Sequence, residues 1–191
     1  MSTSKRKRIS RIKETSPTTV HLIDDKEVFT KNASSDKAKK VLIFNENLNV
    51  EIWIDKHYQN RVYHGSDDGS ERNGIEYVNI EPVLIKSFKH LLYYSLKHKN
   101  FVFVNHPPSR VRNNRLVLKE LIEDEVFLNI VVEYHFIDLN TIEVTLVTAM
   151  KSDDFNMSNG QFGIEFEDDY SKLIQFSKGK LSEIDTYEYN D

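Results

Sequence analysis

The chain has 191 residues, of which 39% are hydrophobic and 29% are charged, and its formal net charge is −4. This length suits one domain whose core is large enough to be stable without cross-links. The sequence contains no cysteine, which excludes disulfides, thiolate zinc sites and cysteine catalysis and favours a reducing compartment.

Charge is distributed unevenly between the two ends of the chain. Residues 5–13 carry six positive charges and no negative one, whereas residues 165–191 contain eight acidic residues and three lysines. We interpret residues 1–20 as a basic, disordered arm that is either a solvated tail or a contact for phosphates. A single α+β domain is expected over residues 21–167, followed by an acidic, partly helical tail over residues 168–191. No apolar run is long enough to span a membrane, so no membrane partner is expected.

The first half of the chain predicts a β-hairpin followed by a helix. An apolar run over residues 41–44 is followed by a turn signal, and apolar residues then alternate with others over residues 48–54. This is the pattern of paired strands with one buried face. Asp55 stands at a natural N-cap, and a helix is expected from about Lys56 to Tyr63 or His64. The next ten residues, 65–74, have the composition of a loop.

A second and stronger helix is predicted from Ile80 to about residue 98, because apolar residues recur there at three- and four-residue steps. The period then changes to two, and we expect strands over residues 101–104, 116–121, 126–137, 141–150 and 162–166, with a short helix over residues 168–177. These elements predict an α+β fold in which two helices pack on a mostly antiparallel sheet of four to five strands, preceded by the β-hairpin. The chain lacks the Gly-rich phosphate loop of parallel nucleotide-binding folds.

Metal and nucleophile motifs do not occur in the sequence. The seven histidines form neither H-E-x-x-H nor H-x-H, and Asp67, Asp68 and Glu71 lack the spacing of a calcium loop. No G-x-S-x-G motif marks a serine nucleophile. We therefore expect no metal and no other cofactor, which leaves histidines with cationic neighbours as the candidates for chemistry.

His57 and Arg61 lie four residues apart on the first predicted helix, which places them on one helix face. Metal-free RNA cleavage requires a group that takes the 2′-hydroxyl proton, a group that protonates the leaving oxygen, and cations that stabilise the phosphorane. Histidine suits the first two tasks because its pKa lies near neutrality. Arginine, lysine and hydroxyl groups suit the third task.

The order of the predicted elements resembles the compact metal-independent ribonucleases of the barnase/EndoU/RelE-like class, which includes mRNA-cleaving toxins and phage-encoded endoribonucleases. The stretches that carry the resemblance are D-K-H-Y-Q-N-R (55–61), E-R-N-G-I (71–75) and V-T-A-M-K (147–151). The resemblance implies an endoribonuclease that attacks RNA through its 2′-hydroxyl and acts in the cytoplasm of a bacterium or an infected host.

Four residues take roles from this resemblance, and His90 is a further candidate. His57 would be the general acid or base, and Arg61 would be its phosphate partner. Thr148 and Lys151 would contact the scissile phosphate, and His90 is a candidate for a second catalytic histidine. The alternative for each of these residues is an ordinary solvated or packed side chain.

Two other interpretations of function stay open. The chain could be a non-enzymatic phage or bacterial interaction protein that binds a host protein or nucleic acid through the Arg-rich loop 105–115. Arg110, Arg112 and Arg115 would then make the contacts. It could also be a structural or assembly subunit, which the β-rich second half suggests. The expected partners are therefore RNA or a host or cognate protein, and the sequence leaves the oligomeric state open.

Overall fold

The computed structural model describes residues 20–22, 29–44, 49–64, 74–106, 114–123 and 126–188. Within these residues there are two helices, α1 (Lys56–His64) and α2 (Tyr77–Lys97). The strands follow one another along the chain as β1 (Val20–Leu22), β2 (Ala38–Phe44), β3 (Asn49–Asp55), β4 (Val104–Asn105), β5 (Leu116–Glu123), β6 (Val126–Asp138), β7 (Thr141–Ser152), β8 (Phe162–Phe166), β9 (Tyr170–Ser177) and β10 (Lys180–Glu188).

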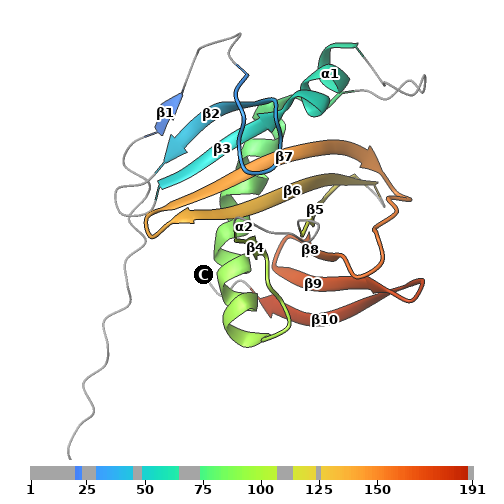
Figure 1. Cartoon of the computed structure of the whole chain (residues 1–191). Coiled ribbons are helices and arrows are strands. Elements are labelled where there is room, and N and C mark those ends of the chain that lie inside the picture. The colour runs from blue at the N-terminus through green and yellow to red at the C-terminus, as the bar shows by residue number, and fades with distance from the viewer. Residues whose placement is uncertain are drawn as a thin grey trace, which may run out of the picture.

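All of these strands belong to one mixed sheet. Their order across the sheet is β1-β2-β3-β7-β6-β5-β8-β9-β10, and β4 pairs with β6 off this path. The pairs β3/β7, β4/β6 and β5/β8 are parallel, whereas the other pairs are antiparallel. Figure 1 shows β6 and β7 as long central strands with β2 and β3 on one side and β8 to β10 on the other.

The prediction of two helices on a mostly antiparallel sheet of four to five strands is wrong. The structure has a sheet of ten strands instead. Two long-range pairings add strands to the sheet that was predicted. The N-terminal hairpin joins the sheet because β3 runs parallel to β7, with Asn49 opposite Thr141. Strand β8 lies between β5 and β9 rather than at an edge. Pairings between segments so far apart leave no local pattern in the sequence.

The prediction of a helix over residues 168–177 is also wrong, because this segment forms β9, which pairs with β10. The two strands meet at a two-residue turn in which Lys178 has φ 52° and Gly179 has φ 74°. A tight hairpin needs such positive φ values, and glycine adopts them without steric cost. The Lys-Gly pair was therefore a hairpin signal in the sequence.

The predicted hairpin and the first two predicted helices, which correspond to α1 and α2, are confirmed. Strand β2 pairs antiparallel with β3, and α1 begins directly after Asp55, whose carboxylate accepts the backbone N–H of His57 at 2.7 Å. No helix in the described part of the chain is long and apolar enough to cross a membrane. Residues 1–19 of the predicted basic arm lie outside the described residues.

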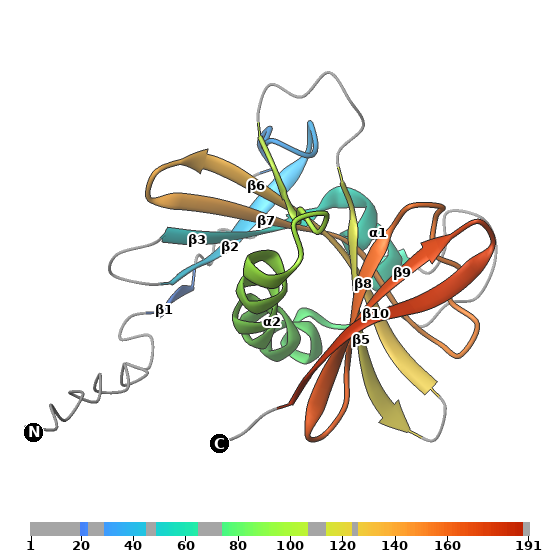
Figure 2. The same cartoon turned by 90° about the horizontal axis from the view of Figure 1, so that it is seen from below.

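Helix α2 lies in the hollow of the curved sheet, as Figure 2 shows from below. Its inward face carries Ile80, Leu84, Leu91 and Tyr94, all of which are fully buried. They pack in one hydrophobic cluster with inward-facing residues of the central strands, such as Val144. Full burial of one such leucine stabilises the fold by about 1.5–3 kcal/mol.

Alternate residues of β5, β6 and β9 form a second, smaller hydrophobic cluster with Met157, in which Val117, Val131 and Ile174 are buried. Buried polar side chains lie farther along β6 and β7, among them Glu133, His135 and Thr145.

Candidate functional site

Two residues of the predicted ribonuclease site meet in the structure. Arg61 on α1 donates a hydrogen bond from its Nη1 to the hydroxyl of Thr148 on β7. The Nε–H of Arg61 is buried and has no hydrogen-bond partner among the described residues. His57 is exposed on the first turn of the same helix, and Lys151 is exposed three residues beyond Thr148. The structure thus joins Arg61 to Thr148, and the side chains of His57 and Lys151 are both exposed.

His90 occupies a different environment from these residues. Its ring is 4% exposed and lies edge-on to Phe166 of β8 and Tyr187 of β10, at centroid distances of 5.1 and 5.3 Å. Its Nδ1 is hydrogen-bonded to the hydroxyl of Ser171 on β9 at 2.9 Å. Burial lowers the pKa of His90 to about 4, and the positive charge of Lys89 adds to this effect. A neutral histidine between helix and sheet is suited to packing, and it faces the β8–β10 end of the sheet rather than β7.

Arg115 immediately precedes β5 and lies beside the buried carboxylate of Glu133 on β6. Its Nε–H donates to Oε1 of Glu133 at 2.8 Å, and the two side chains are 44% and 2% exposed. A guanidinium has five N–H donors, so the rest of this group can serve a ligand while one donor neutralises Glu133. The predicted partner residues Arg110 and Arg112 lie outside the described residues.

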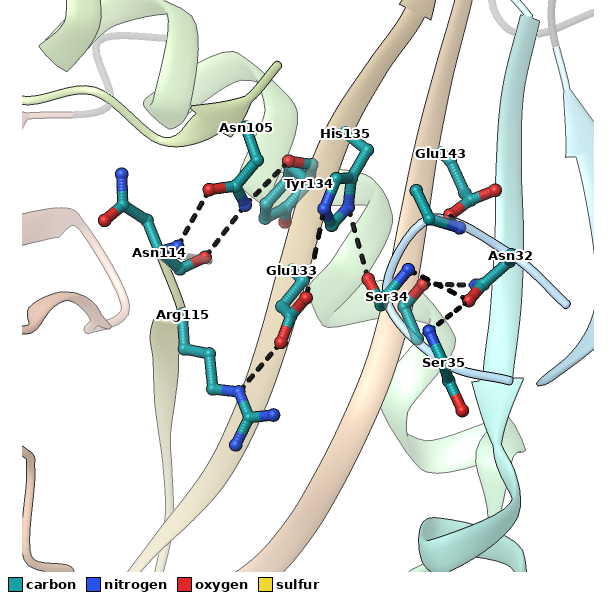
Figure 3. A network of polar contacts seen from close by, with 12 residues as sticks. Asn32, Ser34, Ser35, Asn105, Asn114, Arg115, Glu133, Tyr134, His135 and Glu143 are labelled. Atoms are coloured by element: carbon teal, nitrogen blue, oxygen red, sulfur yellow. Dashed lines mark hydrogen bonds and ion pairs between the residues drawn. The ribbon is translucent and has the colours of Figure 1, made fainter. Parts of the chain in front are cut away.

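Asn105 fixes both ends of the segment that carries these two arginines. Its Nδ2 donates to the carbonyl oxygens of Asn114 at 3.0 Å and Tyr134 at 3.1 Å. Its Oδ1 accepts the backbone N–H of Asn114 at 2.8 Å. Figure 3 shows this amide between Asn114 and Tyr134, next to the pair of Arg115 and Glu133. The amide of Asn105 therefore holds Asn114 next to β4 and β6 at one place on the sheet.

A pocket of about 380 Å³ lies directly beside that place. Its wall carries amide groups, one guanidinium and two aromatic rings, supplied among others by Asn100, Asn114, Gln161, Arg115, Phe103 and Phe162. One side is a tight loop in which Gly160 has φ 85°, a conformation that favours glycine. The loop is held by Ser158, whose backbone N–H donates to Oε1 of Gln161 at 2.8 Å. The volume is in the range of small-molecule sites.

A second polar cluster lies on the outer face of the sheet, where residues 29–37 fold back over β6 and β7. Asn32 donates to the hydroxyl of Thr145 at 2.7 Å, and the backbone N–H of Ala33 donates to Oε1 of Glu143 at 2.9 Å. The hydroxyl of Ser34 is hydrogen-bonded to Nδ1 of His135 at 3.2 Å. Figure 3 shows Ser34 next to His135, and Asn32 joined to Ser34 and Ser35 by dashed lines. The cluster fastens this segment to the sheet.

Burial shifts the pKa of two groups in this second cluster. It raises the pKa of Glu143 and lowers the pKa of His135. The Nε2 of His135 lies 4.0 Å from Oε2 of Glu133, which is too long for a hydrogen bond. Sequence reasoning missed these residues, because their alternation in β6 and β7 resembles an ordinary solvated strand face.

Within the residues that the structure describes, no group of three or more histidine, aspartate or glutamate side chains could hold a metal ion. No protein-family model, curated protein or solved structure matches the chain. The geometry of its own residues is therefore the basis for inferring what it does.

Proposed function

We propose that the protein binds single-stranded RNA through the arginine-bearing segment 105–115 and the pocket beside it. The observation that carries this proposal is the double hydrogen bond between Asn105 and Asn114. It holds Asn114 beside a pocket whose lining includes Arg115, and residues 105 and 114 flank Arg110 and Arg112 in the sequence. Three arginines then lie within one short stretch of chain.

The chemistry of the pocket supports a nucleotide as the ligand. Guanidinium groups bind phosphate oxygens in pairs of parallel hydrogen bonds. The amides of Asn100, Asn114 and Gln161 carry both donors and acceptors, which is what reading the edge of an unpaired base requires. Phe103 and Phe162 add apolar surface to the same wall. A folded duplex would not offer its base edges to a pocket of this size, so a single strand fits better.

The local charge also supports an anionic ligand, although the whole chain has a net charge of −4. Lys99 adjoins Asn100 of the pocket wall, and Lys178 donates its backbone N–H to Oδ1 of Asn159 in the pocket loop at 2.8 Å. Both lysines are exposed. Cations gathered at one place attract phosphate even on an acidic protein, because the interaction is short-ranged at physiological salt.

Fluorescence anisotropy with a labelled single-stranded RNA tests the proposal. Replacing Arg110 and Arg112 together by alanine should weaken binding by about tenfold or more. A matched control removes two exposed lysines from the β2–β3 side of the sheet, Lys37→Ala with Lys56→Ala, and should leave affinity nearly unchanged. Equal loss of affinity in both variants would indicate diffuse charge attraction and contradict binding at this surface. If the wild type binds no RNA, the RNA proposal fails and a protein becomes the expected partner of this surface.

A second candidate function is the metal-independent endoribonuclease, and the hydrogen bond between Arg61 and Thr148 is the observation that favours it. In this proposal His57 acts as the acid or base, and Arg61, Thr148 and Lys151 contact the scissile phosphate. RNA should then be cleaved in EDTA to leave a 2′,3′-cyclic or 3′-phosphate, and His57→Ala should abolish cleavage. Cleavage that EDTA stops, or no cleavage of any RNA, would refute this candidate without affecting the binding proposal.

A further inference from the structure

The solvent-facing side of α2 is nearly as apolar as its buried side. Residues 78, 82, 85, 89, 92 and 96 recur at alternating steps of four and three, which puts them on one stripe of the helix. We call Val78, Pro82, Ile85, Lys89, Leu92 and Leu96 the α2 stripe. Lys89 is its one charged member. Val78, Leu92 and Leu96 are 67%, 54% and 89% exposed. A helix that is apolar on both sides normally has both sides covered.

We propose that the α2 stripe is a homodimer interface in which α2 packs antiparallel against α2 of a second copy. The four–three spacing of the stripe is the spacing that lets two helices pack side by side over several turns. From residue 78 to residue 96 the stripe extends for about 27 Å along the helix axis. Such a length gives several layers of side-chain contact.

The two halves of the stripe have complementary shapes. Its N-terminal half is a shallow depression formed by Val78, Pro82 and Ile85 together with the flanking Glu81 and Lys86. Its C-terminal half projects Leu92 and Leu96 into solvent. In an antiparallel pair the depression of each copy receives these two leucines of the other. A self-complementary patch of this kind closes a two-fold dimer and uses the same surface twice.

Charge favours the antiparallel direction over the parallel one. In a parallel pair the two copies of Lys89 would face each other at the centre of the interface, and like charges there are repulsive. In an antiparallel pair centred on residue 87, Lys89 faces Ile85 of the second copy. Glu81 of that copy then lies one helical turn further along, within reach of the lysine ammonium group. The second copy is therefore the occupant that both the shape and the charge of the stripe fit.

Sedimentation velocity of the full chain tests this inference over roughly 1 to 100 μM, a range that brackets a micromolar Kd. The mass should rise from 22.4 kDa toward twice that value with concentration. The variant Leu92→Glu with Leu96→Glu should stay monomeric. Its matched control is Leu139→Glu, which changes a leucine that is 88% exposed in the turn between β6 and β7 and should dimerise like the wild type. A wild type that remains monomeric, or a double variant that still dimerises, would overturn the inference.

Cysteine cross-linking tests the direction of the pair, because the natural chain has no cysteine. A Val78→Cys protein and a Leu96→Cys protein should each form little disulfide dimer alone, since identical positions lie about 27 Å apart in an antiparallel pair. A mixture of the two proteins should form the heterodimer. Cross-linking of either variant with itself, and none in the mixture, would overturn the antiparallel arrangement.

Discussion

Asn105 and Asn114 hold each other through both polar atoms of the Asn105 amide, at 3.0 Å and 2.8 Å. The Asn105 side chain is almost fully buried, and β4 sets it directly beside His135 of β6. A buried amide satisfied in this way rigidifies its surroundings. The pair therefore holds Asn114, which follows Arg110 and Arg112 in the sequence, against β4 and β6 and beside the pocket.

Replacing Asn105 by alanine should reduce both stability and RNA affinity. The substitution leaves the N–H of Asn114 and two carbonyl oxygens without their partner, and a buried group that loses its hydrogen bond costs about 1–3 kcal/mol. Urea unfolding measures the stability change, and anisotropy measures the affinity. Asn156→Ala, at an exposed position, is the control. An Asn105→Ala protein as stable as the control would refute the anchoring role.

Removing Arg115 should destabilise the fold because the carboxylate of Glu133, which is 2% exposed, would lose its ion pair with this arginine. We expect Arg115→Ala to lower the free energy of unfolding by about 1–3 kcal/mol, less than for a fully buried pair because the arginine is partly solvated. Adding Glu133→Gln removes the carboxylate charge that the arginine neutralises and should restore part of the loss. A double variant that is as unstable as the sum of both single variants would contradict this coupling.

Mild acid should destabilise the protein through His90. Burial lowers the pKa of this histidine to about 4 from its usual 6.5, so the unfolded chain binds a proton at a pH where the folded chain does not. The neutral His90 therefore contributes its full share of the free energy of unfolding above pH 6.5, and this contribution is lost progressively as the pH falls toward 4. At pH 5 the loss is about 2 kcal/mol.

His90→Gln keeps a polar side chain for Ser171 and cannot take up a proton. Its stability should therefore fall less steeply between pH 7 and 5 than that of the wild type, as followed by urea unfolding at each pH. The other buried groups titrate in both proteins, so their contributions to the pH dependence of stability cancel in the comparison. His106→Gln, at an exposed histidine, should keep the wild-type dependence. Parallel pH curves for the wild type and His90→Gln would contradict the role given to burial.

Asn32→Ala should loosen the segment 29–37 from the sheet. The Asn32 amide donates to Thr145 at 2.7 Å, and its oxygen accepts the backbone N–H groups of Ser34 at 3.1 Å and Ser35 at 2.7 Å. Limited proteolysis should cut the variant within this segment faster than it cuts the wild type. The exposed ion pair of Lys31 with Asp36 lies in the same segment, so Lys31→Ala is the matched control and should change the cutting rate little.

Local chemistry predicted the elements of this fold better than their arrangement. The cap at Asp55, the period of α2 and the alternation before α1 are properties of neighbouring residues, and each produced the expected element. The parallel pairing of β3 with β7 and of β5 with β8 depends on which segments meet after the chain collapses. No residue pattern within these four strands specifies which strand each one pairs with, so the ten-stranded sheet could not be predicted.

The candidate sites show the same difference between local patterns, which the sequence reveals, and long-range contacts, which it does not. Arg61 and Thr148 were predicted to share a site on the basis of the resemblance, and the structure places them in contact. The apolar stripe on the outside of α2 was already present as a four–three repeat, but sequence alone could not separate it from the buried face. Asn105 carried no signal at all, because its importance arises from β4 lying against β6.

The salt dependence of RNA binding tests the central claim most directly. Each phosphate contacted in single-stranded RNA contributes about 0.7 to the slope of log affinity against log salt concentration. If Arg110 and Arg112 each contact one phosphate, Arg110→Ala with Arg112→Ala should weaken binding and reduce that slope by about 1.4. The control Lys37→Ala with Lys56→Ala should keep the wild-type slope. Equal affinities and equal slopes in the wild type and the arginine variant would contradict RNA binding at this surface.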